Sequence, residues 1–482
     1  MKAIRISFFY LSLFLLAGSN FVQAAEKHRM IVLSDIEADP DDSQTLVRLL
    51  LYSNQIDIKG LIATTSIHQQ KKVVPETMHR IIDAYGKVQP NLLKHEAGYP
   101  SVAELHRKVK KGLPVFGMLG VGEGKDSEGS DWIIQELEME DERPLWISVW
   151  GGPNTLAQAL WKIRETKSKT EAKRLISKLK VYTISDQDDT GIWMRKNFPD
   201  LFYIVSTGSY GNATWSAINT VVKGINNETI SNDWIAQNIQ QGHGALGAEY
   251  PDVAYGMEGD TPSWLMLILN GLNDDAIPNW GSWGGRYELY IPEPIKGTIP
   301  KVFLGGAEYE PESRPIWTNT DDTFTPRISN SYGRAIRKDT LTVTDNKVTL
   351  WRWRDDFQND FAARMDWCTK EYAEANHPPV PALGTSDEFT VKSGDVFSLD
   401  ASGTTDPDGD NLSYWWFQYP EVGSYGKDIG FAIAENLYLV HTIVAPEVET
   451  PVTTHFILKV TDKGTPALSR YKRVIVTILP KD

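Results

Sequence analysis

The chain has 482 residues, with 63 acidic against 49 basic side chains and a formal net charge of −14. This acidic balance argues against nucleic acid or an anionic membrane as the main partner. Cys368 is the single cysteine, which excludes an intramolecular disulfide and cysteine-rich zinc sites. The length allows two or three domains, which packing must stabilise.

The N-terminus predicts a secretory signal peptide over residues 1–24. Lys2 and Arg5 precede an apolar stretch over residues 6–16, and Val22-Gln-Ala24 has the small residues of a cleavage site. The apolar stretch is short for a membrane anchor. We therefore expect a secreted or periplasmic protein without a membrane anchor. Nothing in the sequence sets an oligomeric state.

From about Met30 to Ser206 the pattern alternates between strands and helices. Expected strands are residues 30–33, 58–65, 144–150, 179–184 and 201–206, and expected helices are residues 43–52, 75–86 and 155–163. Such alternation predicts an α/β domain with a mostly parallel sheet and helices on both faces. Residues 355–372 also predict a helix. We assign the α/β domain to residues 25–376.

A Pro-rich linker over residues 377–382 predicts the next boundary. Residues 383–482 alternate in the manner of strands, at 388–399, 412–419, 454–462 and 471–479. The pattern predicts an all-β sandwich of the immunoglobulin-like type. For Asp406-Pro-Asp-Gly-Asp410, between two of these strands, a plain turn is the simpler interpretation and structural Ca²⁺ binding the alternative.

The most informative stretch is Asp35-Ile-Glu37-Ala-Asp39-Pro-Asp41-Asp42, which holds five acids in eight positions. It lies between the first strand and the first helix, at the carboxyl end of the strand, where open α/β sheets bind ligands. A helix cap would explain Asp41 or Asp42, but not Asp35 or Asp39. A hard cation such as Ca²⁺, which takes about six to eight oxygen ligands, would relieve the repulsion among these acids.

Three other loops carry polar groups near predicted strand or helix ends. Gly151-Gly-Pro-Asn154-Thr155 allows close backbone approach and a carbonyl ligand, although an ordinary capped turn is an equal alternative. Ser185-Asp186-Gln-Asp188-Asp189-Thr-Gly191 suits hydroxyl binding or a second metal contact, with a solvated loop as the alternative. Asp260 precedes the apolar run that begins at Trp264. It could be a helix cap or a ligand that completes the first acidic cluster.

Together these residues resemble the nucleoside hydrolase superfamily, in which an Asp-rich turn after the first strand holds Ca²⁺ below a ribose pocket. Asp35, Glu37, Asp41 and Asp42 have the spacing of its four aspartates. The turn at residues 151–155 resembles the one that lends a carbonyl to the metal, and Asp260 resembles the late aspartate. Glu37 stands in place of Asp, and Glu258-Gly-Asp260 in place of a His-Asp pair, so no leaving-group acid is evident.

A closer resemblance is to secreted bacterial nucleoside hydrolase-like proteins described as cellulose-binding, which also carry a C-terminal β-sandwich. The shared motifs are Asp-Ile-x-x-acid-Pro-Asp-Asp, Ile-Ser-Asp-Gln-Asp-Asp, Glu-Gly-Asp-Thr-Pro-Ser and Trp-Gly-Gly-Arg-Tyr. In that pattern Asp39, rather than Glu37, is the recurrent acid. The resemblance covers nearly the whole chain after the signal peptide.

The first functional hypothesis that the resemblance implies is a Ca²⁺-dependent hydrolase of an N- or O-glycosidic bond. The general base would be Asp35, Glu37 or Asp39. The expected metal ligands are Asp35, Asp39, Asp42, Asn154 and Asp260. The expected substrate-binding residues are Asp41, Asn154, Asp186, Asp188, Asp189 and Glu258. The substrate would be a small molecule that contains a ribosyl-like or other sugar.

The second hypothesis is a binding protein for a polysaccharide such as cellulose, built on a degenerate hydrolase fold. Aromatic stretches at residues 280–287, 351–353 and 414–419 would stack on sugar rings. Trp415, Trp416 and Phe417 are adjacent in a predicted strand, so at least one of them must face the core.

Overall fold

The computed structural model describes residues 26–206, 214–293, 311–326, 341–429 and 438–481. The predicted signal peptide lies outside this part of the chain. Among the described residues, no helix has both the length and the apolar character needed to span a membrane.

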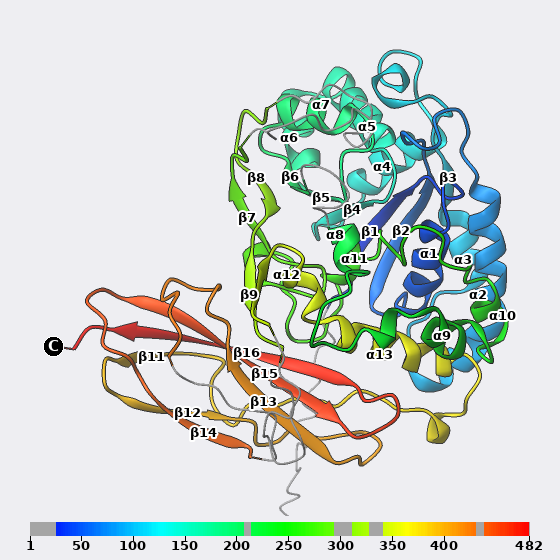
Figure 1. The fold of residues 1–482 in the computed structure, drawn as a ribbon. Helices are drawn as coiled ribbons and strands as arrows, with labels where there is room; N and C mark the ends of the chain where they lie inside the picture. The colour runs from blue at the N-terminus through cyan, green and yellow to red at the C-terminus, as the bar shows by residue number, and fades with distance from the viewer. Residues whose placement is uncertain (1–25, 207–213, 294–310, 327–340, 430–437, 482) are drawn as a thin grey trace, which may run out of the picture.

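A large sheet of eight strands, in the spatial order β3-β2-β1-β4-β5-β6-β8-β7, organises the first half of the fold (Figure 1). The strands are β1 (His28–Ser34), β2 (Ile56–Ala63), β3 (Val109–Lys111), β4 (Leu145–Val149), β5 (Leu179–Thr183), β6 (Phe202–Val205), β7 (Tyr287–Tyr290) and β8 (Ile316–Asn319). All neighbours pair in parallel except β7, which runs antiparallel to β8. The mostly parallel α/β sheet predicted from the sequence is confirmed.

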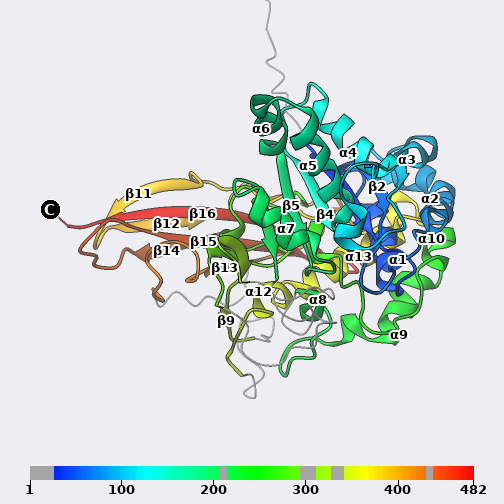
Figure 2. The same ribbon diagram turned by 90° about the horizontal axis from the view of Figure 1, so that it is seen from above.

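Helices cover both faces of this sheet because alternate residues of its strands point to opposite sides. Met30 and Val32 belong to one core, and Ile31 and Leu33 to the other. The first core packs against α1 (Asp41–Leu51), α2 (Pro75–His95), α3 (Val102–Lys108) and α13 (Arg354–Asp366), and the second against α4 (Glu128–Glu138), α5 (Asn154–Thr166), α6 (Lys169–Ser177) and α7 (Thr190–Asn197) (Figure 2). Shorter elements are α8 (Thr214–Ala217), α9 (Asn232–Ile235), α10 (Gly244–Ala248), α11 (Pro262–Leu265), α12 (Val348–Trp351), β9 (Asp322–Phe324) and β10 (Val343–Asp345).

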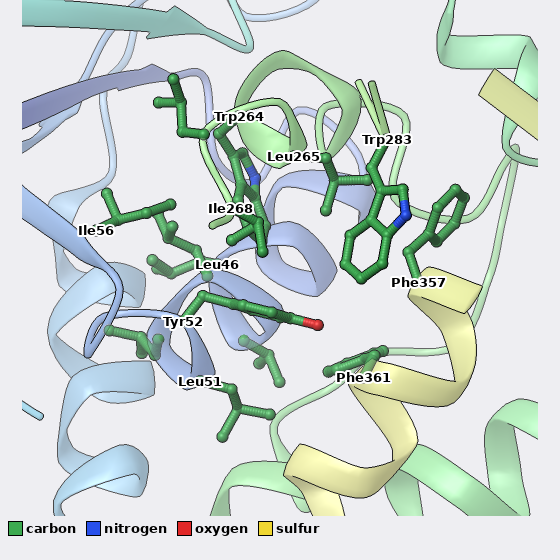
Figure 3. Close-up of a cluster of buried hydrophobic side chains, with 14 of the residues drawn as sticks. Leu46, Leu51, Tyr52, Ile56, Trp264, Leu265, Ile268, Trp283, Phe357 and Phe361 are labelled. Carbon is green, nitrogen blue, oxygen red and sulfur yellow. The ribbon is translucent and has the colours of Figure 1, made fainter. Parts of the chain in front are cut away.

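The core below the acidic turn joins segments that lie far apart in the sequence. Figure 3 shows Leu46 and Tyr52, from the first helix region, facing Trp264 and Phe361. The Tyr52 and Trp264 rings have centroids 5.5 Å apart. The Tyr52 hydroxyl donates to Asp360 on α13 at 2.6 Å. This packing fixes α1, and therefore the turn before it, relative to residues some 200–300 positions later.

The strand-rich C-terminal region forms a sheet in the order β11-β16-β15-β13 and a two-stranded sheet of β12 and β14. The strands are β11 (Glu388–Lys392), β12 (Val396–Asp400), β13 (Leu412–Gln418), β14 (Val440–Val444), β15 (Val452–Asp462) and β16 (Ser469–Leu479). The expected single strand at residues 388–399 is wrong, because a turn with Gly394 at φ +82° divides it into β11 and β12. The immunoglobulin-like type of this sandwich stays a prediction.

Two of the expected helices have different ends. The helix expected at residues 75–86 continues to His95, because Gly86 and Pro90 are tolerated within α2. The helix expected at residues 355–372 ends at Asp366 in α13. Tertiary packing along these helices overrides the local signals of the sequence.

The C-terminal region packs directly on the α/β region, beside α12 and α13 (Figure 1). Phe417 and Tyr471 belong to the same hydrophobic core as β1 and α1, whereas Trp416 belongs to the core of the sandwich. Arg470 pairs with Asp360 at 2.6 Å, and Tyr471 N donates to Asn270 O at 2.9 Å. The two regions therefore share one of the apolar cores, the one that contains residues of β1 and α1.

The aromatic stretches expected to stack on sugars lie largely in these cores. Trp283, Trp351, Trp353, Trp416 and Tyr419 are all buried. Their rings contact each other or the neighbouring core, as when Trp353 packs against Tyr471 with centroids 5.7 Å apart. The expectation that these stretches form a sugar-binding platform is wrong for these residues, because their apolar area is used for packing.

Candidate active site

A pocket of about 410 Å³ opens at the carboxyl ends of the parallel strands. The chain leaves β1 toward β2 and β3 on one side and returns as β4 on the other, so β1 and β4 flank a topological switch point. Asp35 follows β1, His68 follows β2, Trp150 follows β4 and Gln187 follows β5. The remaining lining residues are Ala38, Asp39, Asp41, Asp42, Trp215, Tyr255 and Asp260.

Hydroxyl donors hold the two deepest acids of the turn. The Ser34 hydroxyl donates to Asp42 Oδ1, and the Ser66 hydroxyl donates to Asp35 Oδ2. The side-chain amide of Gln69 donates to the carbonyls of Asp35 and Ile36, each at 3.1 Å. These contacts tie the β1 turn to the loop after β2, so that both carboxylates are held in place.

Asp39 and Asp41 occupy the outer part of the turn. Asp39 is half-buried, and its Oδ1 accepts from the backbone N–H of Asp41 at 3.1 Å. Asp41 Oδ1 accepts from the N–H of Asp42 at 3.0 Å, and Asp41 Oδ2 accepts from the indole of Trp215 at 3.0 Å. Pro40 stands at the N-cap of α1 and no side chain caps the helix. Capping therefore does not account for these acids.

Asp260 reaches the same pocket from far along the chain. It precedes α11, and its backbone carbonyl accepts from the Ser263 hydroxyl at 2.6 Å. The side chain is buried, and Asp260 Oδ2 has no hydrogen-bond partner. A buried carboxylate oxygen without a donor is costly, so this atom indicates a missing positive partner.

The electrostatics of the pocket agree with this geometry. Burial raises the pKa of Asp35 to about 7. The pKa values of Asp41, Asp42 and Asp260 lie well above the ordinary aspartate value, first because of burial and then because of neighbouring carboxylates. These acids repel one another strongly when they are all ionised.

The donor set fits a hard divalent cation. Carboxylate oxygens of Asp39, Asp41 and Asp42 lie within 4.8 Å of one another. The buried carboxylate of Asp35 and the unpartnered oxygen of Asp260 add further carboxylate oxygens to the same pocket. An all-oxygen site of this kind matches the ligand preference of Ca²⁺.

Glu37 points away from the pocket. It has a positive φ of +75°, its side chain is exposed, and its carboxylate accepts from the Thr77 hydroxyl on α2. The left-handed backbone turns Glu37 outward while Asp39 lines the pocket. The structure therefore does not bring Glu37 to the position expected of a general base.

Asn154 and Glu258 are also engaged elsewhere. The Asn154 side chain accepts from Thr64 at 2.7 Å and donates to the Val115 carbonyl at 2.8 Å. Glu258 pairs with Arg48 at 2.6 Å, where both side chains are fully buried. Neither residue lines the pocket. Their side chains are therefore engaged outside the pocket, and the expected ligand roles of Glu258 and of the Asn154 carbonyl stay predictions.

The loop after β5 places its three acids outside the pocket. Asp186 is paired with Arg195, and Asp189 accepts from Met118 N at 2.8 Å. Asp188 is fully buried beside Gly152, and its Oδ1 accepts from the Thr190 hydroxyl at 2.5 Å. Burial raises the pKa of Asp188 to about 7. Only Gln187 of this loop lines the pocket, so direct substrate contact by the three acids is not supported.

Besides Ala38, sequence reasoning missed five lining residues, all with polar or aromatic side chains: His68, Trp150, Gln187, Trp215 and Tyr255. Three of them follow parallel strands, and Trp150 and Gln187 lie within or beside loops already singled out. The rule that strand ends bind ligands could have found these three. Trp215 and Tyr255 lie in segments without a periodic pattern, and no local signal indicates them.

A family model described as cellulose-binding Sde182, nucleoside hydrolase-like domain, matches residues 29–287. A second, described as cellulose-binding protein Sde0182, C-terminal domain, matches residues 396–478. No curated protein matches the sequence.

One solved structure is similar to nearly the whole chain. The chain is 34% identical to a nucleoside hydrolase-related hypothetical protein from Saccharophagus degradans that is associated with carbohydrate metabolism, with a TM-score of 0.77. That match covers 94% of this chain and 100% of the other. The effector protein XOO4466 matches with 10% identity over 71% of this chain and 94% of its own, at a TM-score of 0.30.

Proposed function

Because the chain belongs to the family of cellulose-binding Sde182 proteins with a nucleoside hydrolase-like domain, we propose that its acidic pocket hydrolyses a glycosidic bond. The reaction is Ca²⁺-dependent cleavage of an N- or O-glycosidic bond in a ribosyl-like sugar. The observation that carries this proposal is the buried Asp260 Oδ2, which has no partner and lines a pocket with four other carboxylates. An unpartnered carboxylate oxygen that lines a pocket with other acids is what a cation or substrate would be expected to satisfy.

In this proposal Asp35, Asp42 and Asp260 would hold the cation, and Asp39 lies beside it in the same pocket. When bound, Ca²⁺ supplies a hard Lewis acid that attracts sugar hydroxyls and makes nearby water more acidic. Ser34 and Ser66 orient Asp42 and Asp35, so the carboxylates are arranged before the ligand arrives.

The general base in this proposal is Asp39. Asp39 lines the pocket and is half-buried, so water reaches it. The backbone N–H of Asp41 donates to Asp39 Oδ1 and not to the other oxygen. The other oxygen is available to accept a proton from the attacking water. Water adds to the anomeric carbon while the bond to the leaving group breaks, and the leaving group departs with the bonding electron pair and takes a proton from the solvent. Asp41, oriented by Trp215, is placed to accept a sugar hydroxyl.

Aromatic side chains supply the walls for the rest of the substrate. Trp150 is buried, whereas Tyr255 is 80% exposed at the opening of the pocket. Faces of sugars and of aromatic leaving groups pack well on such rings. This supports a small glycoside, rather than a polymer chain, as the molecule that enters the pocket.

The test is a hydrolysis assay on nucleosides and aryl ribosides, with Ca²⁺ and after chelation. Asp39→Asn is expected to lower kcat by roughly 10²–10⁴-fold, the usual contribution of a general base. Glu37→Gln is the matched control, because this neighbouring acid faces Thr77 and not the pocket. Its kcat should stay within about twofold of the wild type.

Two outcomes would overturn this proposal. The first is the absence of Ca²⁺-dependent turnover on every substrate. The second is an equal loss of activity in Glu37→Gln and Asp39→Asn. That result would mean that lining the pocket is not what makes an acid the general base.

The second candidate is a non-catalytic polysaccharide-binding protein, which the family description favours. The observation that favours it here is a strip of exposed side chains on and beside the two-stranded sheet, which carries apolar residues on both sides of Thr442. Val396 and Val444 are cross-strand partners, and both are exposed, as are Val440 and Tyr438. A flat polysaccharide surface would cover such a strip better than a small molecule would.

Cellulose pull-down of the full chain tests this candidate. Tyr438→Ala should weaken retention at least fivefold if the strip binds, while Tyr255→Ala should leave it unchanged. Retention that resists Tyr438→Ala excludes the strip as the binding surface. We further propose, from the predicted signal peptide, that the protein acts in the periplasm or outside the cell.

A further inference from the structure

A groove runs along the junction between the α/β region and the C-terminal region, beside the linker. It consists of two adjoining hollows of about 670 and 450 Å³, which share Gly271, Pro381 and Lys472 in their walls. Ligand sites in proteins commonly have about 300–1,000 Å³, so the two hollows together have room for an elongated ligand. Among the described residues, none lines both this groove and the acidic pocket.

Two buried side-chain atoms in the wall of the smaller hollow have no hydrogen-bond partner among the described residues. Asn270 is 2% exposed, and its Oδ1 accepts from the backbone N–H groups of Leu272 at 2.9 Å and Asn273 at 3.1 Å. These two bonds fix the orientation of the amide, and the donor left over is Asn270 Nδ2. The other atom is the acceptor Gln55 Oε1.

A hydroxyl is the group that suits both atoms. Its oxygen accepts a hydrogen bond and its hydrogen makes another, so it can serve a donor and an acceptor of the same wall. Leaving a buried polar atom unpaired costs free energy. Asn270 Nδ2 and Gln55 Oε1 therefore indicate a ligand that carries hydroxyls.

The larger hollow meets an open edge of β16. Tyr471 N donates to Asn270 O at 2.9 Å, and Ile475 N donates to Asp387 O at 2.8 Å, so both N–H groups point away from β15. Alternate residues of a strand direct their backbone groups to the same edge, so Arg473 presents its N–H and C=O to the groove. β11 pairs with β16 only from Ile475 onward. An added peptide strand needs several such residues in succession, whereas a hydroxyl needs only one.

The walls of the larger hollow also suit an uncharged ligand with apolar faces. The Trp280 side chain is half-buried and lines this hollow, with the Arg473 guanidinium 5.3 Å from the ring centroid. The charged lining residues are two acids, Asp387 and Glu388, and two bases, Lys472 and Arg473. Balanced charges favour neither a polyanion nor a polycation. A neutral chain of sugar rings, which has both hydroxyls and apolar faces, fits these walls.

We propose that the groove binds a single chain of a neutral polysaccharide. Hydroxyls of the chain meet the open atoms of Asn270, Gln55 and Arg473, and one sugar ring packs on Trp280. This inference rests on the second candidate function, polysaccharide binding, and gives it a surface separate from the strip on and beside β12 and β14. Both regions of the chain supply walls of the groove, so a bound chain also holds the two regions together.

The experiment is calorimetric titration of the full chain with cellohexaose, a soluble neutral oligosaccharide. The wild type is expected to bind one equivalent. Asn270→Asp removes the Nδ2 donor but keeps the Oδ1 acceptor of the turn, so the Kd should rise roughly fivefold or more. Asn226→Asp is the matched control, because its Oδ1 also accepts a backbone N–H, from Glu228 at 2.9 Å, and it lines neither hollow. Its Kd should stay within about twofold of the wild type, and the two variants should have similar Tm values.

Two further variants locate the binding. Trp280→Ala should raise the Kd about tenfold, because the groove loses its aromatic face. Asp42→Asn, in the acidic pocket, should bind cellohexaose as tightly as the wild type does. The proposal fails if Asp42→Asn abolishes binding, or if Asn270→Asp and Trp280→Ala both keep the wild-type affinity, which would leave only water in the groove.

Cellulose pull-down separates this proposal from the function on which it rests. A chain that is retained on cellulose but binds no cellohexaose contradicts the groove and leaves the second candidate function in place. A chain that shows neither retention nor cellohexaose binding contradicts both.

Discussion

Gly151 is packed so closely against Asp35 that a side chain at this position must displace the carboxylate. A Cβ on Gly151 would lie 2.6 Å from Asp35 Oδ1 and 2.8 Å from Asp35 Cβ. Glycine at the end of β4 therefore allows the first acid of the turn to reach the pocket.

We predict that Gly151→Ala weakens Ca²⁺ binding in the pocket at least tenfold, because the Asp35 carboxylate must shift. Calorimetric titration of the full chain measures this effect. Gly60→Ala is the control, since its Cβ would meet only side-chain atoms of Ile31 and Trp132 at 3.2–3.3 Å. Unchanged affinity in Gly151→Ala would mean that Asp35 is not a ligand.

The Arg48–Glu258 pair explains why Glu258, which was expected to bind substrate, lies outside the pocket. Both side chains are fully buried and 2.6 Å apart, and Glu258 also accepts from the Tyr250 hydroxyl at 2.7 Å. We predict that Glu258→Gln lowers the free energy of unfolding by about 3–5 kcal/mol, because Arg48 keeps an uncompensated buried charge. Denaturant titration measures the change, and a loss below about 1 kcal/mol would contradict the prediction.

At the scale of elements, the first turn of α13 joins the two regions of the chain. Asp356 accepts from Lys459 at 2.5 Å, from the Ser469 hydroxyl at 3.1 Å and from the Tyr471 hydroxyl. Three groups of β15 and β16 therefore depend on one carboxylate of a helix in the α/β region.

We predict that Asp356→Ala destabilises the protein by about 3–5 kcal/mol, because it removes an acceptor that three donors share, one of them charged. Its neighbour provides the control. Burial, then the charge of Asp356, raises the pKa of Asp355 to about 6, so Asp355→Asn at pH 7 should be neutral or stabilising. Calorimetric unfolding distinguishes the two variants, and equal destabilisation would contradict the assignment.

At the scale of the whole molecule, buried acids make stability depend on pH. Burial raises the pKa of Asp188 to about 7 and those of Asp355 and Asp462 to about 6. An acid with a raised pKa in the folded state binds more protons folded than unfolded. Its contribution to stability is therefore complete below about pH 4 and is lost as the pH rises to about 7.

We predict that, without added Ca²⁺, these groups lower the free energy of unfolding as the pH rises from about 4 to 7. Denaturant titrations at several pH values measure this slope. In Asp355→Asn, the free energy of unfolding should fall less steeply between about pH 4 and 6 than in the wild type. An unchanged slope in this variant would show that Asp355 does not titrate as the folded environment implies.

Local patterns were sufficient for the five central strands of the large sheet, β2, β1, β4, β5 and β6, but not for β3, β8 and β7 at its edges. The predicted strand Met30-Ile31-Val32-Leu33 lies within β1, and the predicted helix after Asp42 lies within α1 and its C-cap. In both segments the local pattern favours the same structure as the surrounding fold. The turn within residues 388–399 was missed, since alternation continues across it and only a glycine with positive φ indicates the break.

The sequence by itself determined that an acidic turn follows the first strand of a parallel sheet, and that Asp260 is a candidate to join it. Only the tertiary structure decided which acids share the pocket. Glu37 turns outward because its backbone is left-handed, and Glu258 turns away because it neutralises Arg48. Trp215 and Asp260 reach the turn because the core of α1, α11 and α13 brings distant segments together. Side-chain direction and long-range packing are properties of the folded chain, which local patterns do not encode.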